Sequence, residues 1–517
     1  MAIIGQDRVI LWFQEDGNGT PFKPFGVGEK AGGMTGKSVP GAGRTPVYGR
    51  NEFGVPIVIK VNREAPGDLP NATIQIYERA QIDILLEALQ KGCPINIQTR
   101  IVKCGRLNNP NNWDVIDHWS GGEVTAYNPG DAPNAEFSGE SVSIEGSVSF
   151  IHYIRLVATA LAELTTVEIE NLLDIAGIQD EDCNACGNGY PGADKILFVG
   201  AASDGAATEA NLLYTSNGGG TWAATSATPW SAGDFEDINH VEARFINQTQ
   251  IRIVVGTLTT VAGNKANIRY ADVTVGDEGT TVWSTTTIAA TSLADVIHAM
   301  NWLLYDRLYI AAGTAGTSNI YVSDDQGTSD PGVAIYTGSV VINGFAISAD
   351  ESQVFAFGET NLLLRETNQS DVFETRVGPS GGGEFHSVTL AGDNTLYAGN
   401  GTSIYKSTDL GGNAGNWESL KDFGANQRVV AIQCIGGSRA LGGDSQLLRA
   451  IVDDTTGASG TVWISVDGGA TWLQITELTN DGYNAAYFSV IDDNKAVIVG
   501  DADATPLGTI HLLSPKA

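Results

Sequence analysis

Positive charge is scarce in this sequence. It holds 29 Lys and Arg residues against 60 Asp and Glu residues, a formal net charge of −31 at pH 7. The acidic excess is spread along the chain, so we expect the protein to repel nucleic acid and anionic membranes. No basic stripe is present to neutralise phosphates, which argues against sequence-specific DNA binding. A surface along which DNA slides without adhering remains compatible with this charge.

Long apolar runs are also missing. No stretch of about 18 consecutive apolar residues occurs, so no membrane-spanning helix is predicted. The first seven residues lack the basic region and apolar core of a secretory signal, and secretion by the general pathway is not expected. Only five cysteines occur among 517 residues, which argues against a disulfide-stabilised scaffold.

Two of these cysteines, Cys183 and Cys186, form a C-x-x-C pair. Free thiols, a local disulfide, and half of a zinc site completed by Cys93 and Cys104 are all open interpretations. A thioredoxin-type motif is not expected, because no strand–helix–strand unit surrounds the pair. The remaining cysteine, Cys434, is expected to be buried in a strand. The six histidines are scattered and no H-E-x-x-H motif occurs, so no metal ligand, cofactor or catalytic residue is predicted.

Glycine is abundant, with 63 residues, whereas charged residues make up only 17% of the chain. Helix-type periodicity appears in only a few short windows within the first 190 residues, so a mainly β protein is predicted. A chain of 517 residues is too long for one core, and two or more domains are expected.

A short sequence motif, most complete at residues 465–472, recurs between pairs of β-type runs in the second part of the chain. Its position between two such runs predicts a hairpin turn. Its glycines allow positive φ, its Asp or Asn accepts hydrogen bonds from turn amides, and its Trp offers an apolar plate to bury. All of these roles are structural. The copies comprise Ser465, Asp467, Gly469, Thr471 and Trp472; Asn217, Gly219, Thr221 and Trp222; Ser407, Asp409 and Gly411; and Ser323, Asp325 and Gly327.

This motif resembles the Asp-box, or BNR repeat, of sialidases and other β-propellers. In that family the box joins the third and fourth strands of a blade, away from the central channel, so the resemblance implies a fold and not an active site. Seven apolar runs ending in glycine or small residues recur from Ile196 to Gly500, at about the length of one propeller blade. We therefore predict a β-propeller of seven blades over residues 195–517. Its first repeat lacks an innermost strand and its last repeat lacks an outermost strand, so six and eight blades are the alternatives to seven.

For a catalytic member of the family, the resemblance implies three arginines that bind a carboxylate, a Tyr paired with a Glu, and an Asp acid. The expected Arg-Ile-Pro sequence is missing, and the arginines of residues 195–517 lie mostly at strand starts or in loops. Tyr270, Tyr305 and Glu366 are available, but no pattern selects them. The protein is therefore predicted not to be an enzyme, and an Asp-box glycosidase is the least favoured alternative.

Residues 1–180 contain no repeat and a different order of elements. A strand is followed by a long Gly/Pro-rich loop, strands, one amphipathic helix, more strands and a short second helix. Residues 181–194 form the cysteine-containing linker. The main ranges are a strand at Arg8–Gln14, the loop at Phe22–Gly54, strands at Val55–Val61 and Ala72–Tyr77, the main helix at Arg79–Lys91, a strand at Glu140–Phe150 and a short helix at Thr166–Gly177.

This order resembles the tail-tube fold of long-tailed bacteriophages and related injection machines, a β-sandwich or barrel with one main helix. In that family the sheets of neighbouring subunits join into a continuous barrel, the long loop reaches the next ring, and DNA passes through an acidic lumen without binding. The resemblance implies a structural virion protein of the tail, made in the host cytoplasm. Its partners would be further copies in stacked rings, other tail proteins, and host-surface glycans as candidates for an external propeller. The alternative is a non-catalytic propeller adhesin or glycan-binding protein.

Overall fold

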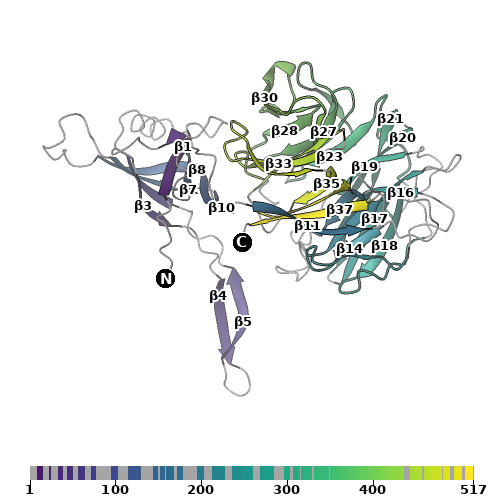
Figure 1. Cartoon of the computed structure of the whole chain (residues 1–517), viewed down its shortest axis with the longest axis horizontal. Coiled ribbons are helices and arrows are strands. Elements are labelled where there is room, and N and C mark those ends of the chain that lie inside the picture. Colours follow the sequence, from purple (N-terminus) through teal and green to yellow (C-terminus); the bar gives the residue numbers. More distant parts are fainter. Residues whose placement is uncertain are drawn as a thin grey trace. The chain divides into compact units, whose positions relative to one another are not determined.

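The computed structural model divides into two compact units, Met1–Ala158 and Thr159–Ala517, which are considered separately. Its described parts are almost entirely β (Figure 1), with a short 3-10 turn at Ala414–Asn416. The structure describes residues 8–14, 23–24, 33–38, 44–50, 56–63, 71–76, 95–102, 115–129, 144–149, 152–157, 159–167, 172–178, 195–202, 212–227, 236–247, 249–259, 268–284, 296–302, 307–314, 316–325, 327–328, 331–348, 350–435, 443–456, 459–479, 481–488, 494–502 and 507–515.

The first unit contains an eight-stranded antiparallel sheet in the order β2-β1-β7-β8-β9-β6-β3, with β10 also paired to β8. The long strand β8 pairs with β7 and β10 through its first half and with β9 through its second half. Ile97, Ile116, Trp119 and Leu156 are fully buried in this sheet. The strands are β1 (Arg8–Gln14), β2 (Lys23–Pro24), β3 (Gly33–Ser38), β6 (Asn71–Ile76), β7 (Ile95–Val102), β8 (Val115–Pro129), β9 (Ile144–Ser149) and β10 (His152–Val157).

A separate two-stranded ribbon, β4 (Arg44–Arg50) with β5 (Pro56–Arg63), completes the described part of this unit (Figure 1). The segment Phe22–Gly54, predicted as one long loop, therefore contains strands β2, β3 and β4. Its glycines and prolines obscured the strand pattern, whereas cross-strand pairing determines the structure. The predicted helix at Arg79–Lys91 and the linker 181–194, with Cys183 and Cys186, lie outside the described residues.

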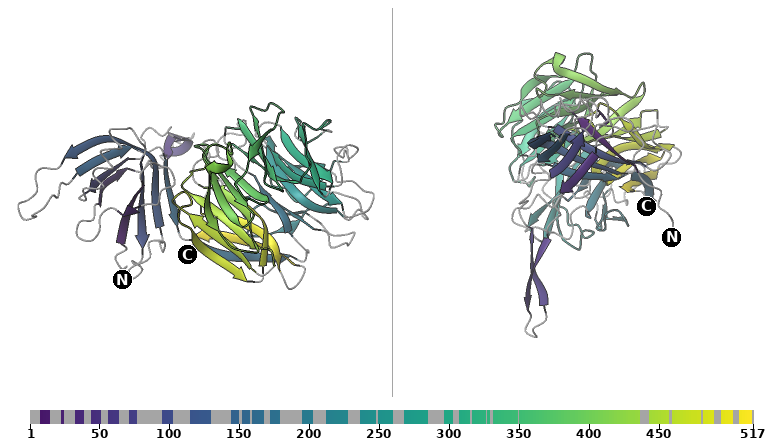
Figure 2. Two further views of the ribbon diagram at one scale, coloured as in Figure 1. Left: turned by 90° about the horizontal axis from the view of Figure 1, so that it is seen from above. Right: turned by 90° about the vertical axis from the view of Figure 1, so that its left-hand side faces the viewer.

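The second unit is a seven-bladed β-propeller (Figures 1 and 2). Five of its sheets have four strands each, and a seven-stranded sheet supplies two more blades joined through the pair Leu258 and Val296. The innermost strands β12, β16, β19, β23, β27, β31 and β35 each contact the next, and β35 contacts β12. The described strands thus close into a ring, which confirms the predicted β-propeller and its blade count.

The blades share one strand order, from the innermost strand outward. In chain order they consist of β12 (Leu172–Gly177), β13 (Leu197–Ala201), β14 (Leu212–Thr215) and β15 (Ala223–Ala224); β16 (Glu236–Asn247), β17 (Gln250–Thr259) and β18 (Ile268–Thr274); β19 (Val296–Trp302), β20 (Leu308–Thr314), β21 (Thr317–Ser323) and β22 (Tyr336–Thr337); β23 (Ile342–Ile347), β24 (Gln353–Gly358), β25 (Leu362–Thr367) and β26 (Glu374–Val377); β27 (Phe385–Leu390), β28 (Leu396–Asn400), β29 (Ser403–Ser407) and β30 (Trp417–Asp422); β31 (Gln427–Cys434), β32 (Leu448–Asp454), β33 (Ser459–Ser465) and β34 (Leu473–Thr479); and β35 (Asp481–Phe488), β36 (Ala496–Ala502), β37 (Leu507–Pro515) and β11 (Thr159–Val167).

Strands β11 and β12 correct the predicted boundary between the domains. Both lie before residue 180, yet β12 is the innermost strand of the first blade and β11 is the outermost strand of the last blade. They supply the two strands that the repeats at residues 195–517 lacked. The propeller therefore begins at Thr159, and its ring closes by pairing β11 with the C-terminal strand β37.

The predicted short helix at Thr166–Gly177 is wrong, because Thr166 and Val167 belong to β11 and Leu172–Gly177 form β12. Leu172 and Ile175 pack in the core between the last and first blades, whereas Ala176 packs between the first and second blades. A strand buried on both faces has apolar residues at consecutive positions and loses the period of two that identifies a half-buried strand. Tertiary packing therefore overrides the local helical pattern.

Every innermost strand contains a β-bulge near its start, which leaves one residue unpaired in the ladder. At three bulges an asparagine donates a side-chain hydrogen bond to a backbone carbonyl of the next blade. These bonds tie neighbouring blades together around the centre. The bulged residues are Leu173, Asn239, His298, Asn343, His386, Val430 and Asn484, and the three carbonyls belong to Ile297, Phe385 and Leu172.

Candidate functional site

The most complete copy of the predicted box forms a clasp within a hairpin turn. The Ser465 hydroxyl donates to Asp467 Oδ1 at 2.9 Å and accepts the Gly469 amide at 2.8 Å. The Thr471 amide donates to Asp467 Oδ1 at 2.8 Å, and its hydroxyl donates to Oδ2 at 2.6 Å. Gly469 has a φ of 89°, a conformation that favours glycine. Trp472 packs against the core between the fifth and sixth blades.

The three looser copies repeat this geometry. In each, a hydroxyl donates to the Asp or Asn two residues later at 2.7–2.8 Å and accepts an amide four residues later at 3.0–3.2 Å. All four clasps connect the third and fourth strands of a blade. Thr215 takes the serine position in one copy. The groups are Ser407, Asp409 and Gly411; Ser323, Asp325 and Gly327; and Thr215, Asn217, Gly219 and Thr221, followed by Trp222 in the core between the last and first blades.

Substituting Asp467→Ala should lower the free energy of unfolding by about 1–3 kcal/mol, because the buried Ser465 hydroxyl and the partly buried Thr471 amide would lose their acceptor. Asp467→Asn should lose less, because the copy built on Asn217 keeps the same bonds with an amide oxygen. Urea unfolding of the two variants measures the difference. Equal losses for the two substitutions would contradict a role for the oxygen acceptor.

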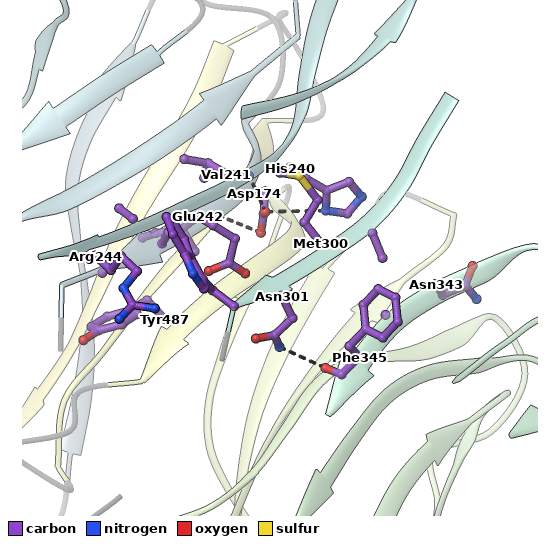
Figure 3. A pocket seen from close by; sticks show the side chains of 17 residues that line it. Asp174, His240, Val241, Glu242, Arg244, Met300, Asn301, Asn343, Phe345 and Tyr487 are labelled. Atoms are coloured by element: carbon purple, nitrogen blue, oxygen red, sulfur yellow. Dashed lines mark hydrogen bonds and ion pairs between the residues drawn. The ribbon is translucent and has the colours of Figure 1, made fainter. Parts of the chain in front are cut away.

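A cavity of about 330 Å³ lies at the centre of the propeller (Figure 3). Its walls come from the innermost strands of five blades, β12, β16, β19, β23 and β35, and none of the clasp residues lines it. Small-molecule sites usually measure about 300–1,000 Å³, so this cavity suits a small ligand or one side chain. Its chemically informative lining residues are Asp174, His240, Glu242, Arg244, Met300, Asn301, Trp302, Asn343, Phe345 and Tyr487.

Asp174 is held rigidly at this cavity. Its Oδ1 accepts the Ile175 amide at 2.9 Å, and its Oδ2 accepts the Val241 amide of the next blade at 2.9 Å. His240 Nδ1 lies 3.6 Å from the same Oδ2. The carboxylate therefore links two blades and presents a fixed negative charge to the cavity.

Arg244 brings the opposite charge to the cavity. The residue is 8% exposed, and its guanidinium carbon lies 4.9 Å from the centroid of the Trp302 ring. Such stacking on an aromatic face favours a cation and limits its movement. The arginine is thus built into the wall between the second and third blades.

Two of the lining residues are asparagines whose nitrogens donate to other groups of the propeller. Asn301 Nδ2 donates to the Phe345 carbonyl at 3.2 Å. Asn343 Nδ2 donates to Glu384 Oε1 at 2.7 Å and to the Phe385 carbonyl at 2.9 Å. Each amide oxygen remains a hydrogen-bond acceptor.

The described arginines of the propeller do not converge in the way that binding of a carboxylate by three arginines requires. Among them, only Arg244 lines the cavity. Others form ion pairs with aspartates elsewhere in the blades. These pairs are Arg252 with Asp272 at 2.7 Å, Arg307 with Asp371, and Arg428 with Asp453 at 2.9 Å.

The tyrosines and the glutamate considered from the sequence also do not form a reactive pair in the cavity. Glu366 is 1% exposed and accepts the hydroxyl of Tyr309 at 2.6 Å. Burial, and then this bond, raise the pKa of Tyr309 well above its usual value. Tyr270 lies against the guanidinium of Arg252, and Tyr305 lies outside the described residues. Cys434 is a buried free thiol in β31, as predicted.

Sequence reasoning missed the cavity residues, although a signal for them exists. An apolar residue followed by Asn or His recurs at the bulges of five innermost strands, and each copy begins the segment that faces the centre. The copies are Ile238-Asn239, Ile297-His298, Ile342-Asn343, Phe385-His386 and Tyr483-Asn484.

No model of a known protein family matches the chain, and no curated protein matches it. YCF48 bound to D1 peptide is 15% identical, with a TM-score of 0.46, over 70% of this chain and 98% of that chain. YCF48 from Cyanidioschyzon merolae is 12% identical, with a TM-score of 0.47, over 69% and 100%. A chain of the mitotic checkpoint complex is 13% identical, with a TM-score of 0.43, over 68% and 93%. The function must therefore be argued from the molecule itself.

No helix among the described residues is long and apolar enough to cross a membrane. No group of three or more His, Cys, Asp or Glu side chains in the same residues is placed to hold a metal ion.

Proposed function

We propose that this chain is a structural protein that assembles through its first unit into stacked rings, as a phage tail-tube subunit does, and carries the propeller as an appended binding domain. The observation that carries the proposal is the ribbon β4–β5, whose strands pair only with each other among the described strands. An isolated two-stranded ribbon is marginally stable in water and gains stability when a third strand or another surface covers it.

The sheet of the first unit also has open edges. Within its described part, β3 pairs only with β6, and β10 pairs only with β8. Unpaired edges are templates for strands of another chain. In the propeller, ring closure pairs the described innermost strands within their blades and packs them against their neighbours, and two of the seven outermost strands, β15 and β22, have just two residues. The open edges of the first unit therefore support self-association through that unit.

The charge of the chain supports the same proposal. With a formal net charge of −31, a channel made from many copies would repel DNA that passes through it. The partners would then be further copies of the chain, other tail proteins and DNA in transit, and the site of action would be the tail of the virion.

Replacing residues 44–63 with a short Gly-Ser connector should abolish tube formation and leave the unfolding temperature of the propeller unchanged. The full chain should form tubes of uniform diameter in negative-stain images, because the ribbon would bridge neighbouring copies. As a matched control, the same connector inserted beside the exposed Val333 should leave assembly intact. If the full chain sediments as a strict monomer at high concentration, the assembly proposal fails.

A second candidate function is ligand binding by the propeller without catalysis, as in an adhesin or a glycan-binding protein. The central cavity favours it, because polar side chains from five blades converge there. The single arginine in the described lining and the burial of Glu366 weigh against a glycosidase. Ligand-dependent shifts of the unfolding temperature would test this candidate separately from assembly.

A further inference from the structure

We propose that the central cavity binds a primary ammonium group, carried either by a free alkylamine or by a lysine side chain. The inference rests on the second candidate function, ligand binding by the propeller, and does not depend on assembly of the first unit. Three features support the inference: the hydrogen-bond acceptors of the lining residues, the net charge of the lining and the size of the cavity.

The first argument is the direction of the two asparagine amides. Because Asn301 donates to the Phe345 carbonyl and Asn343 donates to Glu384 and the Phe385 carbonyl, their oxygens are the groups left for a ligand. Neither oxygen accepts a bond in the described interactions. A ligand that satisfies both must bring N–H or O–H donors, and an ammonium group brings three N–H donors.

The second argument is charge. Figure 3 shows the carboxylates of Asp174 and Glu242 among the lining side chains, together with one guanidinium. Two carboxylates and one guanidinium, with histidine counted as neutral, leave a formal charge of −1. The guanidinium of Arg244 is stacked on Trp302 and 8% exposed, so it is poorly placed to receive an anion. A cation is therefore favoured over a carboxylate or a phosphate.

The third argument is size and shape. At about 330 Å³, the cavity lies near the lower end of the range for ligand sites and is too small for an oligosaccharide. Phe345 and Met300 are 7% and 6% exposed and lie among the lining residues. They offer apolar contact to the methylene groups of an alkyl chain while the ammonium reaches the acceptors.

Titration calorimetry of the full chain with three small probes tests the ligand class. n-Butylammonium has charge, donors and an alkyl chain; tetramethylammonium has the charge without N–H donors; 1-butanol has the chain without the charge. Butylammonium should bind with a Kd of about 1–10 mM, and the other two should bind at least about tenfold more weakly. Nα-acetyl-lysine amide and spermidine then distinguish a lysine side chain from a free polyamine by which one binds more tightly.

Two variants test the site. Glu242→Gln should weaken butylammonium binding about tenfold, because a charge-assisted bond becomes a neutral one. Asn301→Leu should weaken butylammonium binding about fivefold, because leucine has a similar size to asparagine but offers no hydrogen-bond acceptor. Glu374→Gln, which removes the same charge from a side chain that is 68% exposed on the outer strand β26, is the matched control and should leave binding unchanged.

Three results would overturn the inference. Tetramethylammonium could bind as well as butylammonium, Glu374→Gln could weaken binding as much as Glu242→Gln, or acetate or a neutral monosaccharide could bind in place of the amine. The first two outcomes would indicate only general attraction to an acidic protein. None of these three binding results changes whether the full chain forms tubes, and loss of tube formation does not change whether the propeller binds butylammonium. Failure of the assembly proposal and failure of the binding proposal can therefore be recognised separately.

Discussion

A fragment that begins at residue 195 should fail to fold, whereas residues 159–517 should fold as a propeller. The shorter fragment lacks β12, which carries the fully buried Leu172 and precedes the equally buried Ile178, and it lacks β11, the partner of β37. Burial of each such side chain contributes about 1.5–3 kcal/mol, and a typical domain is stable by only about 5–15 kcal/mol. Losing both strands therefore removes stabilisation comparable to the whole stability of the domain.

Near-UV circular dichroism and the cooperativity of thermal unfolding distinguish the two fragments. The variant Leu172→Ala in residues 159–517 provides a graded check, and it should lower the free energy of unfolding by about 2–5 kcal/mol. Cooperative unfolding of the fragment that begins at residue 195 would contradict the closure of the ring by β11 and β12.

Lowering the pH from 7 to 4.5 should destabilise the propeller through His511, which is 1% exposed in the closing strand β37. Burial lowers the pKa of His511 from 6.5 to about 4. The unfolded chain then binds a proton between pH 6.5 and pH 4 that the folded chain does not bind. Stability is complete above pH 6.5 and falls as the pH approaches 4, by about 3 kcal/mol in all.

Urea unfolding at a series of pH values measures this loss, and the variant His511→Leu should show a shallower dependence on pH. Burial lowers the pKa values of His298 and His386 in the same direction, so part of the slope should remain in the variant. Hydrogen bonds lower the pKa values of Asp422 and Asp454, whose stabilisation is lost chiefly below pH 4, outside the window. An unchanged slope in the variant would show that His511 is not the titrating group.

The repeat in the sequence predicted most of the propeller, because local chemistry specifies each turn. A hydroxyl, an Asp or Asn, glycines and a Trp produce the same clasp at Ser465 and at Ser407, wherever the blade lies in the chain. The clasp needs only residues within a few positions of one another, so it can be recognised without tertiary information. The same locality explains why it marks the outer strands and says nothing about the centre.

The cavity could not be predicted in the same way. Asp174, Glu242 and Asn301 come from three different blades, and more than sixty residues separate the first from the second. The apolar residue followed by Asn or His at the bulges marks where an innermost strand turns to the centre, but it does not say which side chains meet there. Only closure of the ring brings them to one space. The orientation of the Asn301 amide is likewise set by a carbonyl of the following blade.

The sequence by itself determined that the chain is acidic and mainly β, and that a seven-blade repeat occupies its C-terminal part, because composition and turn chemistry are local properties. Only the tertiary structure decided that the propeller begins at Thr159 and that residues 172–177 form a strand. It also decided that carboxylates and amide oxygens from separate blades share a cavity. The physical reason is that β11 pairs with β37, and one face of β12 packs against Tyr487, Val497 and Ile510, all more than three hundred positions away along the chain. The other face of β12 packs against the next blade, and these tertiary contacts outweigh local propensity once the ring has closed.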